Sequence, residues 1–305
     1  MAVTAQQVKE LREMTGAGMM DCKNVLVETD GDMNKAVELL REKGLVKAAK
    51  KAGRVASQGI AAIAFSANGK SASAVEVNSE TDFVAKNEEF IEFAGKLADI
   101  ALKTEIEGID AFMAQAYEKE GTVQDALNNR IAKIGENLTV RRFKRFAEPG
   151  CVYTGYTHGG GKIGVVVGFL TDASLDEIAV MGKDVAMQVA SMSPKFLTEA
   201  DVDAEYIESE KKIMTQLVIN EGKSGDMVEK IVAGKIKKEI KEVCLASQKF
   251  VKDNEMTVEQ YIEKSAKELG KPIKASSMLR YEVGEGIEKN EENFAEEVAK
   301  QIAGN

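Results

Sequence analysis

Two stretches of the chain alternate apolar and polar residues on either side of a glycine turn, which is the pattern of an antiparallel β-hairpin. The first spans 59–77 around Asn68-Gly69, and the second spans 152–170 around three glycines at 159–161. Asn-Gly is the strongest short hairpin signal, because both residues tolerate the left-handed backbone of a tight turn. An amphipathic helix follows each hairpin. The sequence therefore predicts an α+β fold with a duplicated antiparallel hairpin-plus-helix core.

Three short helices are expected at the N-terminus. A capping box at Thr4 and Gln7 starts the first helix, the glycines at 16–18 separate it from the second, and the third ends at Gly44. They predict a compact, UBA-like helical domain. The lysine-rich stretch 45–54 predicts a partly helical linker to the core.

A highly charged region follows the second hairpin and its helix. Apolar residues recur at intervals of three and four along 201–245, with a glycine-rich break at 222–225. This narrow stripe predicts a helical hairpin that either lies on the core or protrudes as an antiparallel coiled coil. A capped helix at 257–270, a strand at 278–283 and a final helix at 291–302 complete the chain.

These patterns divide the chain into five parts. They are an N-terminal domain with linker (1–54), a first core subdomain (55–142), a second core subdomain (143–200 with 246–290), the helical hairpin (201–245) and a C-terminal helix (291–305).

Composition favours a soluble cytoplasmic protein. The 305 residues are 44% hydrophobic, which suffices for a substantial core. No apolar run is long enough to cross a bilayer, and the N-terminus lacks the order of a signal peptide, so no membrane association is expected. Cys22, Cys151 and Cys244 show no paired spacing. We therefore expect no disulfide framework, no metal site and no cofactor.

The charge balance argues against nucleic acid as a direct ligand. A formal net charge of −9 repels phosphate backbones unless a strong basic patch compensates. Basic residues cluster at 43–54 and at 141–145, but neither cluster interleaves aromatic residues at stacking intervals. We interpret both as solvated faces. The 43–54 cluster also suits docking to an acidic protein partner.

No catalytic pattern is present. The chain has one histidine, His158, and lacks the nucleophile elbow and zinc-protease motifs. Its Gly-Lys strings lack the remaining residues of a phosphate-binding loop. The sequence therefore predicts a protein without covalent chemistry.

The connection after the first hairpin is longer than its counterpart near 172–174, and it carries an aromatic residue, Phe83. Most loop-borne phenylalanines fold back onto their own domain. However, a lengthened loop on a rigid scaffold is a common place for function.

Four collinear stretches resemble the signatures of the translation elongation factor Ts family. They are LREMTGAGMMDCK at 11–23, SETDFVAKN at 79–87, KIGENLTVRR at 133–142 and YEVGEGIEK at 281–289. The resemblance implies a guanine-nucleotide exchange factor whose partner is elongation factor Tu, in its GDP-bound and nucleotide-free states. It also implies that the 201–245 hairpin protrudes.

The resemblance further implies roles for individual residues. Thr81, Asp82, Phe83 and Val84 would displace the magnesium ion of the partner. Partner contacts would come from Arg12, Met19, Met20, Lys23, Ile134, Gly135 and His158. Since adjacent helix residues cannot share one face, we expect one of the two methionines to be packed inside the N-terminal domain.

Two other interpretations remain open. One is a scaffold protein that oligomerises through the helical hairpin, and the other is an RNA-binding module that uses residues 43–54. The sequence also leaves open whether the 201–245 hairpin forms a homodimer or contacts the partner. The segment 103–129 fits the family only loosely, and we interpret it as a surface insertion without an assigned role.

Overall fold

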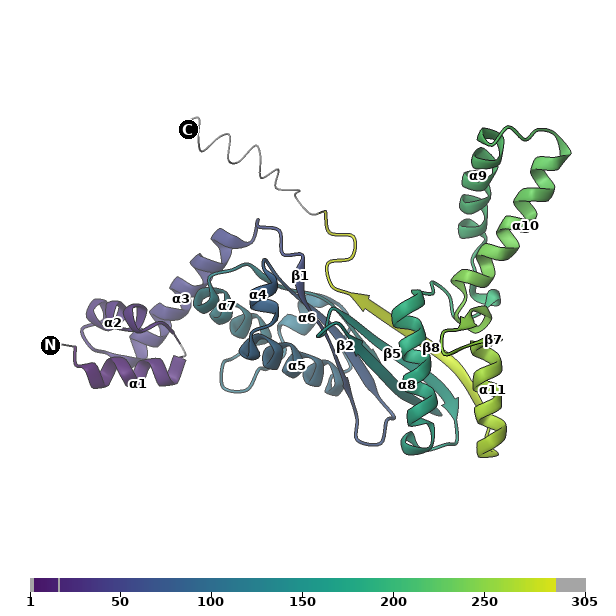
Figure 1. The fold of residues 1–305 in the computed structure, drawn as a ribbon. Coiled ribbons are helices and arrows are strands. Elements are labelled where there is room, and N and C mark those ends of the chain that lie inside the picture. Colours follow the sequence, from purple (N-terminus) through teal and green to yellow (C-terminus); the bar gives the residue numbers. More distant parts are fainter. Residues whose placement is uncertain (1–2, 16, 289–305) are drawn as a thin grey trace.

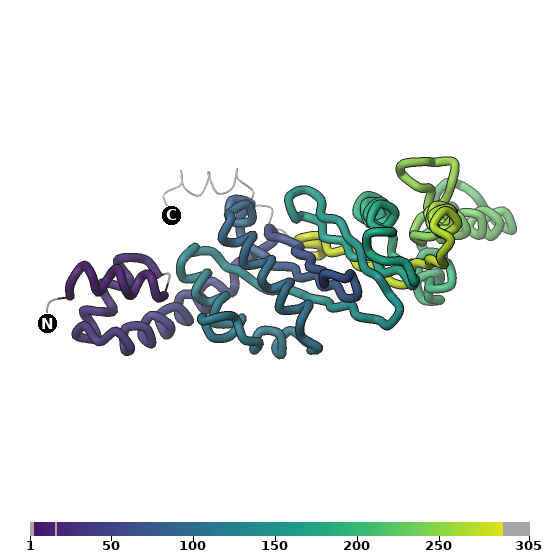
Figure 2. The backbone as a smooth tube through the Cα atoms, turned by 90° about the horizontal axis from the view of Figure 1, so that it is seen from below, coloured from purple at the N-terminus to yellow at the C-terminus, as the bar shows by residue number. Residues whose placement is uncertain are grey.

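The computed structural model describes residues 3–15 and 17–288. The predicted C-terminal helix at 291–302 lies outside these residues. Helices and sheets are mixed, as expected for an α+β protein. The chain is elongated: the N-terminal helices lie at one end, two sheets lie in the middle, and a helical hairpin lies at the other end (Figures 1 and 2).

The first predicted hairpin is present and belongs to a three-stranded antiparallel sheet in the order β1-β2-β3. Its strands are β1 (Gln58–Phe65), β2 (Ala72–Ser79) and β3 (Leu138–Phe146). Gly69 has a φ of 67°, which its lack of a side chain permits. The helix α5 (Glu88–Lys103) buries Phe90, Phe93 and Leu97 against this sheet. Two further helices, α6 (Ile109–Met113) and α7 (Val123–Ile134), complete this core.

The second predicted hairpin forms a sheet in the order β4-β5-β8. Its strands are β4 (Cys151–His158), β5 (Ile163–Thr171) and β8 (Ile273–Glu282). The helices α8 (Leu175–Met192) and α11 (Val258–Leu269) pack on it, beside a short ribbon of β6 (Lys249–Phe250) and β7 (Asp253–Thr257). The strand predicted at 278–283 begins earlier, at Ile273, because a bulge at Gly168 lets β8 follow β5 along its whole length.

The two sheets contact each other through small residues. Ala61 of β1 donates its backbone N–H to Gly161 at 2.8 Å. A Cβ atom at Gly164 would lie only 2.7 Å from the Ala61 carbonyl oxygen, so this position requires glycine. Around them, Ala72, Ala74 and Val166 are buried. The close approach makes the two sheets one continuous packed body.

The N-terminal helices are α1 (Ala5–Thr15), α2 (Met19–Glu28) and α3 (Met33–Lys51). The prediction that the third helix ends at Gly44 is wrong, since α3 continues for two further turns through most of the expected linker. Gly44 is buried, and a Cβ atom there would lie 3.8 Å from Ala132 of α7. Gly44 therefore lies where α3 packs against α7, at a spacing that would also accept a methyl group.

Ion pairs reinforce this packing. Arg41 donates a hydrogen bond from Nε to Asp125 of α7 at 3.1 Å, and its Nη2 atom forms an ion pair with the same carboxylate at 2.5 Å. In the basic cluster, Lys43 pairs with Glu28 and Lys47 with Asp21, Lys51 donates to the Gly135 carbonyl, and Arg54 pairs with Glu80. These four cations of the 43–54 cluster therefore join α3 and the residues after it to neighbouring elements.

The predicted helical hairpin consists of α9 (Ala204–Asn220) and α10 (Asp226–Val243) and protrudes from the rest of the chain (Figure 1). Val218, Val228 and Val232 form a buried cluster of their own between the two helices. At the root, the backbone N–H groups of Lys195 and Phe196 donate to the Val243 carbonyl oxygen. The hairpin is thus attached at its base only. Short 3₁₀ turns at Glu199–Asp201 and Leu245–Ser247 flank it.

Because its apolar cluster is separate, the hairpin should be removable. We expect replacement of residues 204–242 by a short Gly/Ser linker to leave one cooperative melting transition, with a midpoint close to that of the full chain. Calorimetry measures this directly. A control with alanine at Leu245, which is buried in the second core, should melt at a clearly lower temperature. Loss of cooperativity in the deletion would show that the hairpin is part of the core.

The Arg41–Asp125 pair should make stability depend on pH. The Arg41 hydrogen bond is the main reason why the pKa of Asp125 is lowered to about 2. A depressed folded-state pKa contributes stability that is complete above the unfolded value of ~4 and is lost as the pH falls toward 2. Since Arg41 is largely exposed, we expect R41A to lose about 1 kcal/mol in urea unfolding at pH 7.

The difference between R41A and the unmodified chain should shrink below about pH 4. The exposed pair Lys9–Glu13 provides the control, since K9A should change stability little at any pH. A pH-independent difference for R41A would show that Arg41 acts through packing alone.

Candidate partner-binding site

The 81–84 segment is held in a defined conformation. Sequence reasoning placed Phe83 on a loop, whereas the structure shows a single helical turn, α4 (Asp82–Ala85). The Thr81 hydroxyl caps this turn by accepting the Val84 backbone N–H at 3.4 Å. Val84 packs against the first core, while Phe83 is 82% exposed. The aromatic ring therefore does not fold back onto its own domain, and Val84 provides the apolar anchor.

Polar contacts connect the 81–84 segment to the end of α7. Glu136 accepts two hydrogen bonds from Thr81, from the backbone N–H at 3.0 Å and from the hydroxyl at 2.6 Å. Glu80 accepts the Asn137 backbone N–H at 2.5 Å. The sequence analysis did not identify Glu136 as a site residue. The only signal for it in the sequence was its position directly after Ile134 and Gly135.

Asp82 is exposed beside positive charges. Its carboxylate accepts a hydrogen bond from Lys86 at 2.6 Å. This contact is the main reason why the pKa of Asp82 lies below its ordinary value, and Lys162 in the β4–β5 turn lowers it further. Asp82 thus presents a negative charge beside Phe83.

The structure brings Ile134 and Gly135 close to the 81–84 segment. Ile134 is the last residue of α7 and packs, like Val84, against the first core. Gly135 follows with a φ of 87°, in the left-handed conformation common after a helix. Because Glu136 comes next and bonds Thr81, the two segments form one surface.

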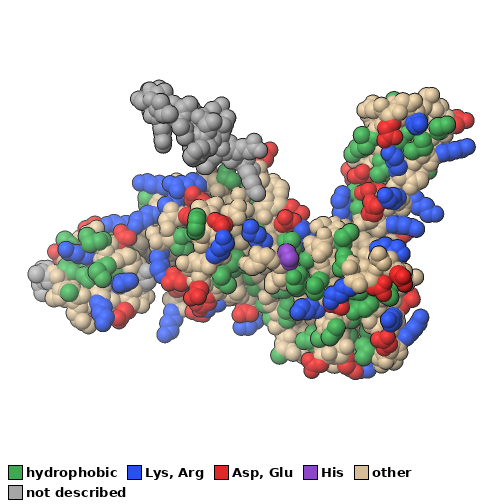
Figure 3. Space-filling model, in the orientation of Figure 1, with side chains coloured by type: hydrophobic (Ala, Val, Ile, Leu, Met, Phe, Trp, Pro, Cys, Tyr) green, Lys and Arg blue, Asp and Glu red, His purple; other side chains and the backbone are tan. Residues whose placement is uncertain are grey.

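His158 lies at the β4–β5 turn. Its ring is exposed, and its Nδ1 atom lies 3.1 Å from the Tyr156 hydroxyl (Figure 3). Gly161 in this turn accepts the Ala61 backbone N–H, so the turn lies against β1 of the first sheet. His158 therefore belongs to the same middle part of the chain as Phe83.

The four N-terminal residues lie elsewhere, on α1 and α2. Arg12 and Lys23 are exposed. The expectation that Met19 or Met20 is packed inside the domain is wrong, because they are 58% and 63% exposed. Both occupy the first turn of α2, whereas Cys22, Val25 and Leu26 carry its buried face. Met14 is also exposed, so this end presents several flexible apolar side chains (Figure 3).

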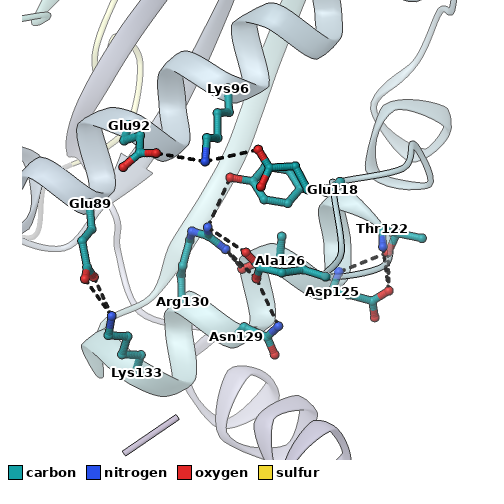
Figure 4. Close-up of polar contacts among 12 residues, drawn as sticks. Glu89, Glu92, Lys96, Glu118, Thr122, Asp125, Ala126, Asn129, Arg130 and Lys133 are labelled. Carbon is teal, nitrogen blue, oxygen red and sulfur yellow. Dashed lines mark hydrogen bonds and ion pairs between the residues drawn. The ribbon is translucent and has the colours of Figure 1, made fainter. Parts of the chain in front are cut away.

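The 103–129 segment packs into the first core and contacts α7, next to the site. The interpretation of this segment as a surface insertion is wrong. Tyr117 is buried in the first core, as is Phe112. Arg130 of α7 lies 4.3 Å above the Phe93 ring. It also donates to the Tyr117 hydroxyl and pairs with Glu120 (Figure 4). These contacts fix α7, whose end holds the 81–84 segment. The high polarity of the segment concealed its few buried aromatic residues.

Among residues 3–15 and 17–288, no group of three or more His, Cys, Asp or Glu side chains is arranged to hold a metal ion. Within the same residues, no helix is both long enough and apolar enough to span a bilayer. Cys22, Cys151 and Cys244 are buried and not disulfide-bonded.

Comparison with known proteins places the chain in a family. The family model "Elongation factor TS" matches residues 80–285. "Elongation factor Ts" of Clostridioides difficile (strain 630) is 56% identical over 98% of this chain and 99% of its own length. The protein of the same name from Clostridium perfringens (strain SM101 / Type A) is 52% identical over 98% of both chains. The chain therefore belongs to the elongation factor Ts family.

The exposure of Phe83 can be tested by stability. We expect F83A to change the free energy of unfolding by no more than about 0.5 kcal/mol, because the ring packs against little. V84A should cost about 1 kcal/mol, since it removes partly buried methyl groups. Urea unfolding of both variants makes the comparison. A larger loss in F83A than in V84A would place the ring in the core.

Proposed function

We propose that the chain is a guanine-nucleotide exchange factor for elongation factor Tu that performs no covalent chemistry. Family membership supports the reaction. The observation that carries the proposal is the exposure of Phe83, 82%, on a turn that the core holds rigidly. Exposed aromatic residues on ordered scaffolds are frequent anchors in protein interfaces.

Phe83 acts as a wedge beside the partner's nucleotide site. Magnesium demands near-octahedral coordination, so a small displacement of the loops that orient its ligands releases it. Without the ion, the negative charge of the nucleotide's phosphates is less well neutralised. The nucleotide then dissociates faster. Burial of the ring in a partner groove supplies about 1.5–3 kcal/mol, comparable with a typical coupling free energy of ~1–3 kcal/mol.

The remaining residues of the 81–84 segment have separate tasks in this proposal. Asp82 brings negative charge toward the magnesium site, where it opposes phosphate binding. Thr81 and Val84 fix the turn, the first through Glu136 and the second through the core.

Affinity comes from the other contacts. Linkage requires that nucleotide weakens factor binding as much as the factor weakens nucleotide binding, so several separate contacts must hold the complex. In this proposal they are Arg12, Met19, Met20 and Lys23 on the N-terminal helices, Ile134 and Gly135 beside the wedge, and His158 at the β4–β5 turn. Their spread along the elongated chain suits a partner of several domains (Figure 1).

The helical hairpin is a candidate for contacts with a second copy of the chain. Ile213, Leu217 and Met227 are each about half exposed or more on α9 and α10. These apolar side chains favour a homodimer through residues 201–245. Measuring the mass in solution of the full chain and of the hairpin deletion tests this.

The double variant D82A/F83A tests the wedge. The unmodified chain should accelerate release of labelled GDP from elongation factor Tu and leave the nucleotide chemically intact. At saturating factor, the variant should release GDP roughly five- to 150-fold more slowly, because the coupling free energy is lost while other contacts remain. Stopped-flow fluorescence measures both rates.

Two outcomes would contradict the proposal. An unmodified chain without effect on release would remove the exchange function and favour the scaffold interpretation. A variant that reaches the full rate at saturation would show that Phe83 is only one more contact. The matched control is I91A, which truncates an exposed apolar side chain on α5. It should behave like the unmodified chain.

A further inference from the structure

Two glutamates form a reciprocal contact between segments that are far apart in the sequence. Glu136 accepts the backbone N–H of Thr81, and Glu80 accepts the backbone N–H of Asn137, at 3.0 Å and 2.5 Å. Each carboxylate thus binds the residue that follows the other carboxylate. The Thr81 hydroxyl adds a third hydrogen bond to Glu136, at 2.6 Å.

The 81–84 segment needs this support. The α4 turn has four residues, and a helix of that length is not stable in water by itself. Phe83 contributes almost no packing, and Val84 is the only large apolar side chain that anchors the turn. Hydrogen bonds to a charged group are among the stronger ones. Glu136 therefore fixes the residue at which the turn begins, Thr81, through both its backbone and its hydroxyl.

Glu136 is itself fixed in position. It follows the left-handed residue Gly135, so the helix end determines the direction of the chain there. The Asn137 side chain donates to the Arg54 carbonyl oxygen at 2.7 Å, and the Arg54 side chain pairs with Glu80. The backbone that carries Glu136 is thus held on both sides, by the helix end at Gly135 and by the contact of Asn137 with Arg54, which lies just beyond α3.

We propose that Glu136 is a positioning residue for nucleotide exchange, which holds the 81–84 segment in the conformation that inserts Phe83 into the partner. This role rests on the proposed function of that segment. Glu136 acts through Thr81 and touches neither nucleotide nor magnesium. Without it, the turn samples other conformations, and binding to the partner must order it again.

The first experiment measures order in the free chain. The sequence contains no tryptophan, so F83W introduces a single tryptophan as the fluorescent reporter at the wedge. We expect E136A to lower the anisotropy of this reporter on the nanosecond timescale. E136Q should preserve most of it, because its amide can still accept from the Thr81 backbone and donate to the hydroxyl.

Two further variants make the comparison specific. E89A removes a carboxylate that also bonds α7, through Lys133 at 2.7 Å, but does not contact Thr81, and it should leave the anisotropy unchanged. T81V removes the hydroxyl that both donates to Glu136 and caps the Val84 N–H, but it keeps the backbone bond to Glu136, and it should lower the anisotropy partly. If E136A does not fold, T81V and E136Q decide the question.

The second experiment measures stimulated GDP release with phenylalanine restored at position 83. We expect E136A to slow the maximal rate about three- to thirtyfold, with E136Q and E89A close to the unmodified chain. Combining E136A with D82A/F83A should add almost nothing, because both changes remove the same wedge.

The outcomes separate this role from the proposed function. Unchanged anisotropy in E136A would overturn the role whatever happens to exchange. Lowered anisotropy with full stimulated release, or an E136A effect that adds fully to D82A/F83A, would also overturn it. The proposed exchange function fails only if the unmodified chain does not accelerate release.

Discussion

The core formed by the two packed sheets depends on the hydrogen bonds and ion pairs of one buried carboxylate, that of Glu76. Glu76 lies on β2 and is fully buried, with hydrogen bonds from Arg141, Arg142 and the Gly284 backbone. Burial alone would raise its pKa, but the hydrogen bonds from Gly284, Asn78 and Arg142 lower it below the ordinary value. Loss of one partner from such a buried pair costs about 3–5 kcal/mol. The first sheet and the chain after β8 are therefore tied together by charge as well as by packing.

From this core, the structure transmits rigidity to the candidate site through α7. Arg130 fixes α7 against the Phe93 and Tyr117 rings, and Asp125 fixes it against Arg41 of α3. The end of α7 then supplies Glu136. The N-terminal helices and the 81–84 segment are thus held by the same helix, which sets their relative positions before a partner arrives.

Local signals predicted the elements well, because turns and caps depend on neighbouring residues. Asn68-Gly69 predicted its hairpin. Asp32, whose short polar side chain is typical of a helix start, caps α3. Distant contacts were not predictable. Gly44 lies inside a helix that packs against α7, and Glu136 bonds a residue 55 positions away. The same applies to Met19 and Met20, which are exposed because the buried face of α2 is carried by Cys22, Val25 and Leu26.

An exposed phenylalanine is costly for a free protein, since it offers a site for unspecific association. A flexible loop could hide the ring against its own domain until the partner binds, but ordering such a loop would then reduce the free energy left for the proposed displacement of magnesium. The contacts of Glu136 and Val84 order the turn during folding instead. The free energy of burying Phe83 is then available for coupling, which is the quantity that an exchange factor must supply.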